Sequence, residues 1–97
     1  MFTWINSQAV RCDQGFEVES MGRFTIDYRE GSKKVSVYVE NGMEGGKPCV
    51  IIMKPTAFEK WDGDPPGASN PLEKQQEMLR NFIEAMEFQG LAVVVNR

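Results

Sequence analysis

The sequence predicts an α+β fold: a small, mainly antiparallel sheet with a hairpin, packed against one long C-terminal helix, plus a short helical turn. Three observations lead to this prediction. Apolar and polar residues alternate with a period of two over 24–29 and 35–40, which is typical of half-buried strands. Between Asn70 and Gly90, apolar residues recur at spacings of three, four and seven, as on one face of a helix. An apolar run at 91–95 then forms a closing strand.

Length and composition indicate one globular domain over residues 1–97. Of these residues 41% are hydrophobic and 26% are charged, with a formal net charge of −3, values that are ordinary for a folded domain. The longest apolar runs, 49–53 and 91–95, fall far short of the roughly 20 residues that cross a bilayer. Residues 1–6 lack the basic and apolar regions of a secretory signal. We therefore expect a cytoplasmic protein without membrane association.

The absence of histidine restricts the chemistry of the chain. Histidine is the commonest metal ligand and the usual acid–base group near neutral pH, so serine–histidine and cysteine–histidine devices are excluded within one chain. Cys12 and Cys49 cannot form a structural zinc site by themselves. We expect both to be reduced and buried as small apolar groups. We accordingly expect no catalytic residue, no metal and no cofactor.

Two registers fit the central hairpin. One uses Glu30-Gly31 as the turn and places Asp27 opposite Lys34, so that opposite charges pair. The other slides the turn by one residue and places Arg29 opposite Lys34. Both keep the apolar faces matched. We prefer the first register because its charge pairing is better.

The flanking segments predict further elements. The glycine-rich segment 41–46 predicts a flexible hairpin loop, since it lacks the strand-to-helix setting of a phosphate-binding loop. The run 49–53 is apolar on both faces and predicts a central strand. Its Val50 and Ile52 are expected to face away from the helix, shielded by the N-terminal segment or by a second subunit. Residues 1–22 predict one or two strands with a turn at Asp13-Gln14-Gly15.

The segment from Thr56 onward carries helix signals. Thr56 and Glu59 have the spacing of a capping box, which predicts one helical turn that ends near Gly63. Asn70 is a good N-cap with proline after it, and Gly90 suits the position that follows a helix. These signals predict the long helix between those two residues.

A set of landmarks resembles a known family. They are Phe-x-Ile-x-Tyr at 24–28, Lys-Lys-Val-Ser-Val-Tyr-Val-Glu at 33–40, Val-Ile-Ile at 50–52, Trp61 before a proline-containing loop, and a helix at 73–86 followed by Gly90 and a strand. This pattern, over 23–96, resembles the Imm74 family, small predicted immunity proteins of bacterial polymorphic toxin systems. The resemblance implies a non-catalytic protein that binds and neutralises a cognate toxin.

Charge and exposure suggest where such a partner would bind. Residues 57–90 contain seven acidic and three basic residues. This excess of negative charge disfavours nucleic-acid binding and suits a basic protein partner. An acidic helix face can also serve solubility alone. The predicted contact residues are Tyr38, Glu40, Glu59, Trp61, Asp62 and Asp64. For Trp61 the alternative is packing in the core.

Two other functions stay open. One is a homo-oligomeric structural or regulatory domain, such as a homodimer, because a small open sheet leaves an exposed edge. The other is a small hydrolase that uses Asp62 and Asp64, although no third ligand or base is spaced to join them. Loop solvation is the simpler reading of these two aspartates.

Overall fold

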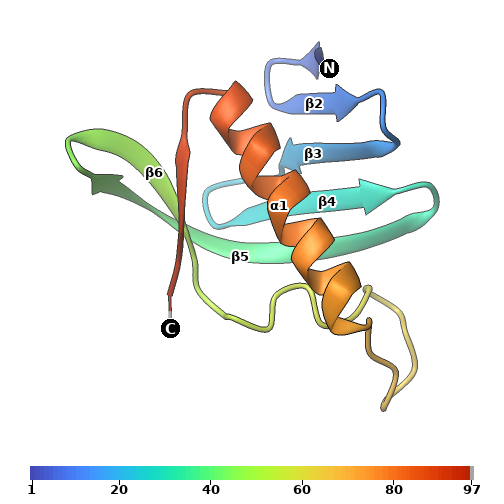
Figure 1. Cartoon of the computed structure of the whole chain (residues 1–97). Coiled ribbons are helices and arrows are strands. Elements are labelled where there is room, and N and C mark those ends of the chain that lie inside the picture. The colour runs from blue at the N-terminus through green and yellow to red at the C-terminus, as the bar shows by residue number, and fades with distance from the viewer. Residues whose placement is uncertain (97) are drawn as a thin grey trace.

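The computed structural model describes residues 1–96, which form one sheet of seven strands and one helix (Figure 1). The elements are β1 (Phe2–Asn6), β2 (Ala9–Cys12), β3 (Phe16–Ser20), β4 (Thr25–Glu30), β5 (Lys33–Glu44), β6 (Lys47–Ile52), α1 (Leu72–Phe88) and β7 (Ala92–Val95). The strands lie in the sheet in chain order. Each pair is antiparallel except β6–β7, which is parallel because α1 returns the chain to the same end of the sheet.

The predicted fold class is therefore wrong in its sheet and in its short helical turn. In place of the predicted small, mainly antiparallel sheet, the structure has a seven-stranded mixed sheet, and with 44% strand against 18% helix it is a sheet-dominated α+β fold. Residues 54–59 form two overlapping four-residue turns and no helix; Ala57 N donates to Lys54 O and Glu59 N donates to Thr56 O. Helix nucleation is costly, and Pro55 and Gly63 leave too few residues to repay it.

The N-terminal segment contributes three strands. The turn predicted at 13–15 is present, since Gly15 N donates to Cys12 O. The strand β2 escaped prediction because Ala9, Val10 and Cys12 are all buried, so the segment shows no clean alternation. Phe2 lies 5.7 Å from Phe16 between ring centroids, on the side of the sheet that faces the helix.

The preferred hairpin register is wrong and the alternative is observed. Glu30 pairs with Lys33, which makes Gly31-Ser32 the turn. Gly31 has φ +59° and no other residue of the turn has positive φ, as in a type II′ turn with glycine first. Asp27 gains from this register, because Ser36 stands opposite it and its hydroxyl donates to Asp27 Oδ1 at 2.8 Å.

The predicted glycine loop is shorter than expected because β5 continues through Gly42 to Glu44. A Cβ atom at Gly42 would lie 2.9 Å from Ile51 Cδ1 on the neighbouring strand, so the glycine permits close packing within the sheet. The turn itself is Gly45-Gly46, both with positive φ. The strand β6 lies between β5 and β7, as the prediction of a central strand requires.

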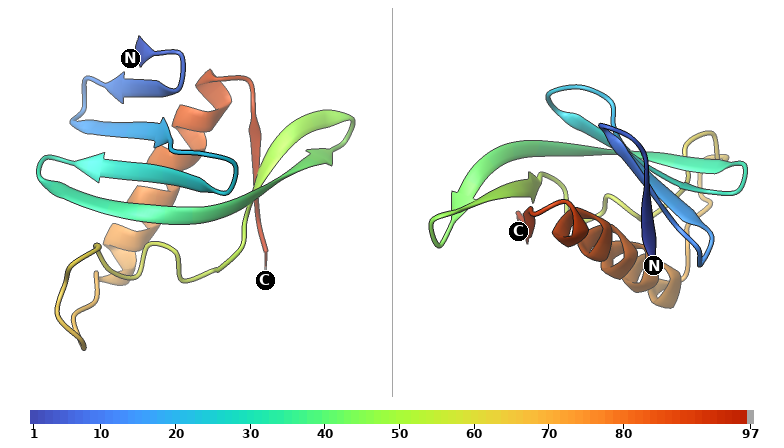
Figure 2. Two further views of the ribbon diagram at one scale, coloured as in Figure 1. Left: turned by 180° about the vertical axis from the view of Figure 1, so that it is seen from behind. Right: turned by 90° about the horizontal axis from the view of Figure 1, so that it is seen from above.

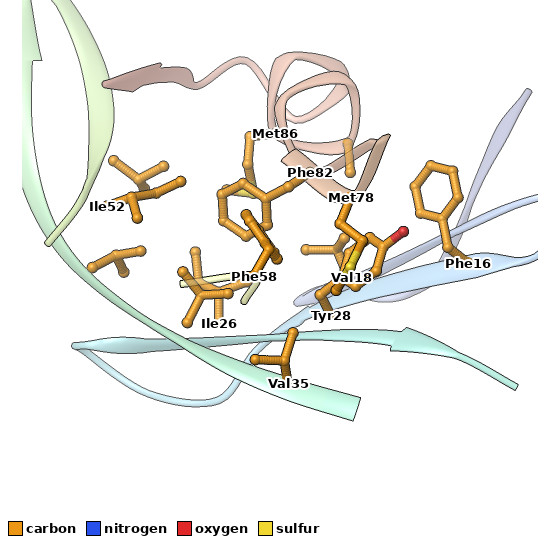
Figure 3. Close-up of a cluster of buried hydrophobic side chains, with 14 of the residues drawn as sticks. Phe16, Val18, Ile26, Tyr28, Val35, Ile52, Phe58, Met78, Phe82 and Met86 are labelled. Atoms are coloured by element: carbon orange, nitrogen blue, oxygen red, sulfur yellow. The ribbon is translucent and has the colours of Figure 1, made fainter. Parts of the chain in front are cut away.

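The helix lies across one face of the sheet, and the core fills the space between them (Figures 1 and 2). Figure 3 shows Met78, Phe82 and Met86 of α1 pointing at Ile26, Tyr28 and Val18 of the sheet, with Phe58 beside them. Val50 and Ile52 belong to this core, so the prediction that they face away from the helix is wrong. Their neighbours Cys49 and Ile51 take the other face, because side chains alternate along a strand.

The helix ends as predicted but does not begin as predicted. Leu91 N donates to Met86 O and Gly90 N to Glu87 O, which is the Schellman arrangement with glycine in the left-handed conformation. At the other end, Asn70 makes no side-chain cap. Its Nδ2 donates instead to Phe58 O at 3.1 Å, so Asn70 fastens the loop before the helix.

Two further findings concern the described residues. Cys12 and Cys49 are both buried free thiols. The helix α1 lacks the length and apolar character that a membrane span requires.

Candidate functional site

On the side of β5 that faces β6, only the second half of the strand pairs with a strand, and a loop covers the first half. The strand β5 pairs with β4 over Thr25–Glu30, but β6 pairs with it only from Val39 onward. The loop 53–71 runs along the remaining edge (Figure 1). Asp62 N donates to Lys34 O at 2.8 Å, and Asp62 Oδ2 accepts from Ser36 N at 3.2 Å. Asp62 therefore takes the place of one residue of a neighbouring strand and pairs with Lys34 and Ser36 of β5.

Two buried aromatic residues anchor this loop to the core. Phe58 and Trp61 are buried, and their rings lie 5.8 and 6.1 Å from the ring of Tyr28. Asn70 N donates to Glu59 O at 2.6 Å, which closes the segment between them into a compact surface loop. The apolar residues of the loop thus hold its polar residues against the edge of β5.

Two hollows adjoin at this edge. The first, which we call the edge hollow, has a volume of about 540 Å³ and lies between Ser36 and Tyr38 of β5 and Lys54, Glu59 and Asp62 of the loop. The second, the corner hollow, has a volume of about 480 Å³ and is lined by Phe24, Tyr38, Val39, Glu40, Met53 and Lys54. Tyr38 and Lys54 line both hollows. With 61% of its surface exposed, Tyr38 forms a prominent apolar feature between them.

The structure gathers four of the six predicted contact residues here. Tyr38, Glu59 and Asp62 line the edge hollow, and Glu40 lines the corner hollow. Trp61 is 4% exposed and stacked on Tyr28, so it packs in the core. Asp64 is half-buried and accepts a hydrogen bond from Trp61 N at 3.2 Å through Oδ2. Asp62 and Asp64 therefore both act on the backbone, which accounts for two acids in this loop.

Sequence reasoning missed Phe24, Met53 and Lys54. Alternation placed Phe24 with Ile26 and Tyr28 inside the core, yet Phe24 is 52% exposed and precedes the first residue of β4. A guanidinium at Arg23 lies 5.3 Å from its ring centroid. Cation–π contacts of this kind also form at exposed sites. Met53 and Lys54 follow the end of β6, and no pattern marked them.

A charged network supports the edge from the outer face of the sheet. Asp27 is 4% exposed, and its carboxylate lies near Arg29 Nη2 at 3.3 Å and Lys34 Nζ at 3.8 Å, besides the Ser36 hydroxyl. Lys34 Nζ also lies 3.9 Å from Asp62 Oδ2. A buried carboxylate is tolerated when it is paired and hydrogen-bonded in this way. The network fixes Ser36 and Asp62, the two residues at one end of the edge hollow.

A second polar cluster joins the helix to the sheet. Asn81 Nδ2 donates to Tyr28 Oη at 3.0 Å, Tyr28 Oη donates to Glu30 Oε2 at 2.5 Å, and Lys74 Nζ lies 2.7 Å from Glu30 Oε1. Burial, and then the bond to Glu30, raises the pKa of Tyr28 well above its ordinary value. The same carboxylate raises the pKa of Lys74. Each polar side chain of this cluster has a hydrogen-bond or ion-pair partner within it, so the cluster has a structural role.

The two hollows are lined by aromatic, charged and backbone groups. Among residues 1–96, no three Asp, Glu or Cys side chains lie close enough together to hold a metal ion. Tyrosine is a residue type enriched at protein interfaces, whose rims are polar. Comparison of the chain with family models, with curated proteins and with solved structures gives no match in any of the three.

Proposed function

We propose that this protein is a non-catalytic immunity protein that acts in the cytoplasm by binding and neutralising a cognate bacterial toxin. The observation that supports this proposal is the exposed ring of Tyr38 between two adjoining hollows. The identity of the partner rests on the resemblance to the Imm74 family in the order of strands, Trp61, helix and Gly90.

The composition of the site supports a protein partner. Tyrosine is enriched among the residues that dominate binding energy, because it buries a large rigid surface and keeps one polar group. Three acids, Glu40, Glu59 and Asp62, and two lysines, Lys54 and Lys60, line the hollows around it. Charges at the rim of an interface act on the association rate with a partner of complementary charge more than on affinity. Tyr38 is therefore expected to supply most of the binding energy, and the charged side chains to speed association.

The test is co-expression with the toxin encoded by a neighbouring gene, followed by calorimetry on the purified pair. We expect growth to be rescued and a complex of nanomolar class, the range of many stable protein complexes. Replacing Tyr38 with threonine should weaken binding at least about tenfold, as for a hot-spot residue. Met43→Ala is the matched control, because Met43 is also exposed on β5 but lines neither hollow. Absence of any complex would contradict the proposal.

One observation supports a second candidate function, a homo-oligomeric structural or regulatory domain. The strand β7 is an edge of the sheet, and its residues Ala92–Val95 are all apolar and half-buried. Edge strands without charge or proline favour pairing with another chain. Sedimentation at high protein concentration tests this alternative, and a monomer throughout would remove it.

A further inference from the structure

Two backbone groups of β5 inside the edge hollow are left without a partner. They are the C=O of Ser36 and the N–H of Tyr38. Within residues 1–96, no hydrogen bond joins either group to the loop 53–71 or to a side chain. Unpaired backbone groups at a sheet edge are a template for pairing with another chain, and we call this short unpaired stretch the edge window.

The hydrogen-bond pattern of β5 shows that both groups point into the hollow. Val39 N donates to Phe24 O, and alternate residues of an antiparallel strand bond to the same neighbour. Val37 and Val39 therefore bond to β4, whereas Ser36 and Tyr38 turn their backbone groups the other way. Ser36 and Tyr38 both line the edge hollow.

The edge window is closed at both ends. At one end, Asp62 N donates to Lys34 O and the Asp62 carboxylate accepts from Ser36 N. At the other, Met53 N donates to Tyr38 O at 3.1 Å, but the return bond from Tyr38 N is not made because the chain leaves the sheet after β6. What remains open is one acceptor and one donor, on either side of Val37. In a parallel ladder, a single residue of the added strand bonds to both such groups.

We propose that the edge window binds one extended residue of a peptide segment from the partner protein, as a parallel addition to β5. The N–H of that residue donates to Ser36 O, and its C=O accepts from Tyr38 N–H. This is strand addition in its shortest form, with backbone bonds giving affinity and the adjoining hollows giving specificity. It rests on the proposed function for the identity of the partner.

Charge favours this occupant and this direction. Asp62 stands at the Ser36 end, and Lys54 follows Met53 at the Tyr38 end. A parallel segment places its N-terminal side toward Asp62 and its C-terminal side toward Lys54. It should therefore carry a basic residue before the bound one and an acidic residue or the chain carboxylate after it. The ring of Tyr38 and the corner hollow beyond it would receive an apolar side chain.

The experiment compares two variants at one position. A phage-displayed library of random linear heptapeptides is selected on the wild-type protein, and enriched peptides are then measured by calorimetry. Tyr38→Ala removes the ring and keeps the N–H, whereas Tyr38→Pro removes both, and proline is tolerated at an edge position whose N–H faces outward. We expect Tyr38→Pro to bind about tenfold more weakly than Tyr38→Ala, as for one lost hydrogen bond. Equal binding by the two variants, or no enrichment, would overturn the proposal.

Amide exchange on the wild-type protein gives a second readout that does not depend on how Tyr38→Pro folds. In the free protein, the amide of Tyr38 should exchange markedly faster than those of Val37 and Val39, which bond to β4. An enriched peptide should slow exchange at Tyr38 and leave the two valines unchanged. Unchanged exchange at Tyr38 in the bound state overturns the proposal.

The same measurement separates this proposal from the proposed function. A toxin complex in which Tyr38 N–H still exchanges fast would overturn the edge window and leave toxin binding intact. If the protein binds peptides at the edge window but neutralises no toxin, the proposed function is overturned and the edge window stands.

Discussion

Tyr28 and Tyr38 lie on adjacent strands of the same hairpin, yet one is 0% and the other 61% exposed. Tyr28 shares its face of β4 with Ile26 and points toward the helix. Tyr38 lies on the opposite face from Val37 and Val39 and points outward. For these two tyrosines, the position in the alternation, and not the residue type, decides which side chain belongs to the core.

The surroundings of the two tyrosines differ in the same way. Tyr28 is stacked against Phe16 and Trp61, and its hydroxyl is fully paired. Tyr38 lies between two hollows, beside unpaired backbone. The fold therefore depends on Tyr28 and tolerates change at Tyr38.

The largest loss of stability should come from the helix side of the core. Phe82 is fully buried, and its ring lies 5.8 Å from that of Phe58. Phe82→Ala should lower the free energy of unfolding by about 3–5 kcal/mol, the usual cost of such a cavity. Urea denaturation followed by circular dichroism measures the change. Phe24→Ala is the matched control, since Phe24 is exposed, and it should cost less than about 1 kcal/mol; equal losses would contradict the assigned core.

Removing the Tyr28 hydroxyl should have the next largest effect. Tyr28→Phe keeps the ring but leaves Asn81, which is buried, without its acceptor. We expect a loss of about 1–3 kcal/mol in the free energy of unfolding, the cost of an unsatisfied buried group. The double variant Tyr28→Phe with Asn81→Leu should recover part of this loss. If the two substitutions simply add, the hydrogen bond between them is not important to stability.

The elements that the sequence predicted well were those with strong local signals. Gly90 ends the helix because only glycine readily adopts the conformation needed there, and Ile26, Val35 and Val37 show plain alternation. The hairpin register was missed because charge pairing was judged between two residues, whereas Asp27 is satisfied by Ser36, Arg29 and Lys34 together. Such a three-partner environment exists only after the strands have assembled.

Stability should fall above about pH 10. The pKa of Tyr28 is raised in the folded protein above its ordinary value of 10.0, so the unfolded chain loses this proton first. The unfolded state then binds fewer protons than the native state, and each such proton costs about 1.4 kcal/mol per pH unit. Lys74, whose pKa is also raised, acts in the same direction above its ordinary value of 10.5. Urea midpoints from pH 8 to 11 measure this decline.

Tyr28→Phe provides the control for the alkaline decline, because it removes one of the two titrating groups. The variant should be less stable at pH 8 but should lose less stability between pH 10 and 11. An unchanged slope would assign the decline to other groups.

Asp62 should contribute a smaller, local stability. Its carboxylate accepts from Ser36 N and lies 3.9 Å from Lys34 Nζ. Asp62→Ala should cost about 0.5–1.5 kcal/mol, as for one exposed hydrogen bond, and should speed amide exchange at Ser36. Glu59→Ala is the control, since Glu59 lines the same hollow but its side chain makes no hydrogen bond or ion pair among the described residues. Equal effects would show that Asp62 does not cap the edge.

The candidate site was only partly predictable for a related reason. Tyr38 and Glu40 could be placed on an outward face from alternation along one strand. The role of Asp62 could not, because it depends on where the loop 53–71 crosses β5, and the contact Asp62–Ser36 spans 26 residues. For Trp61, packing in the core was the alternative to partner contact, and its burial and its stacking on Tyr28 confirm that alternative. Local patterns carry no information about such pairings.

The smallest effect on stability is expected where the effect on function should be largest. Tyr38→Thr removes an exposed ring and keeps a residue that favours extended backbone, and the bonds of β5 to β4 on either side are unaffected. The free energy of unfolding should therefore change by less than about 0.5 kcal/mol. Toxin affinity, measured on the same preparation, should fall at least about tenfold. A large loss of stability would mean that Tyr38, like Tyr28, is retained for packing, and the contrast between the two faces would then fail.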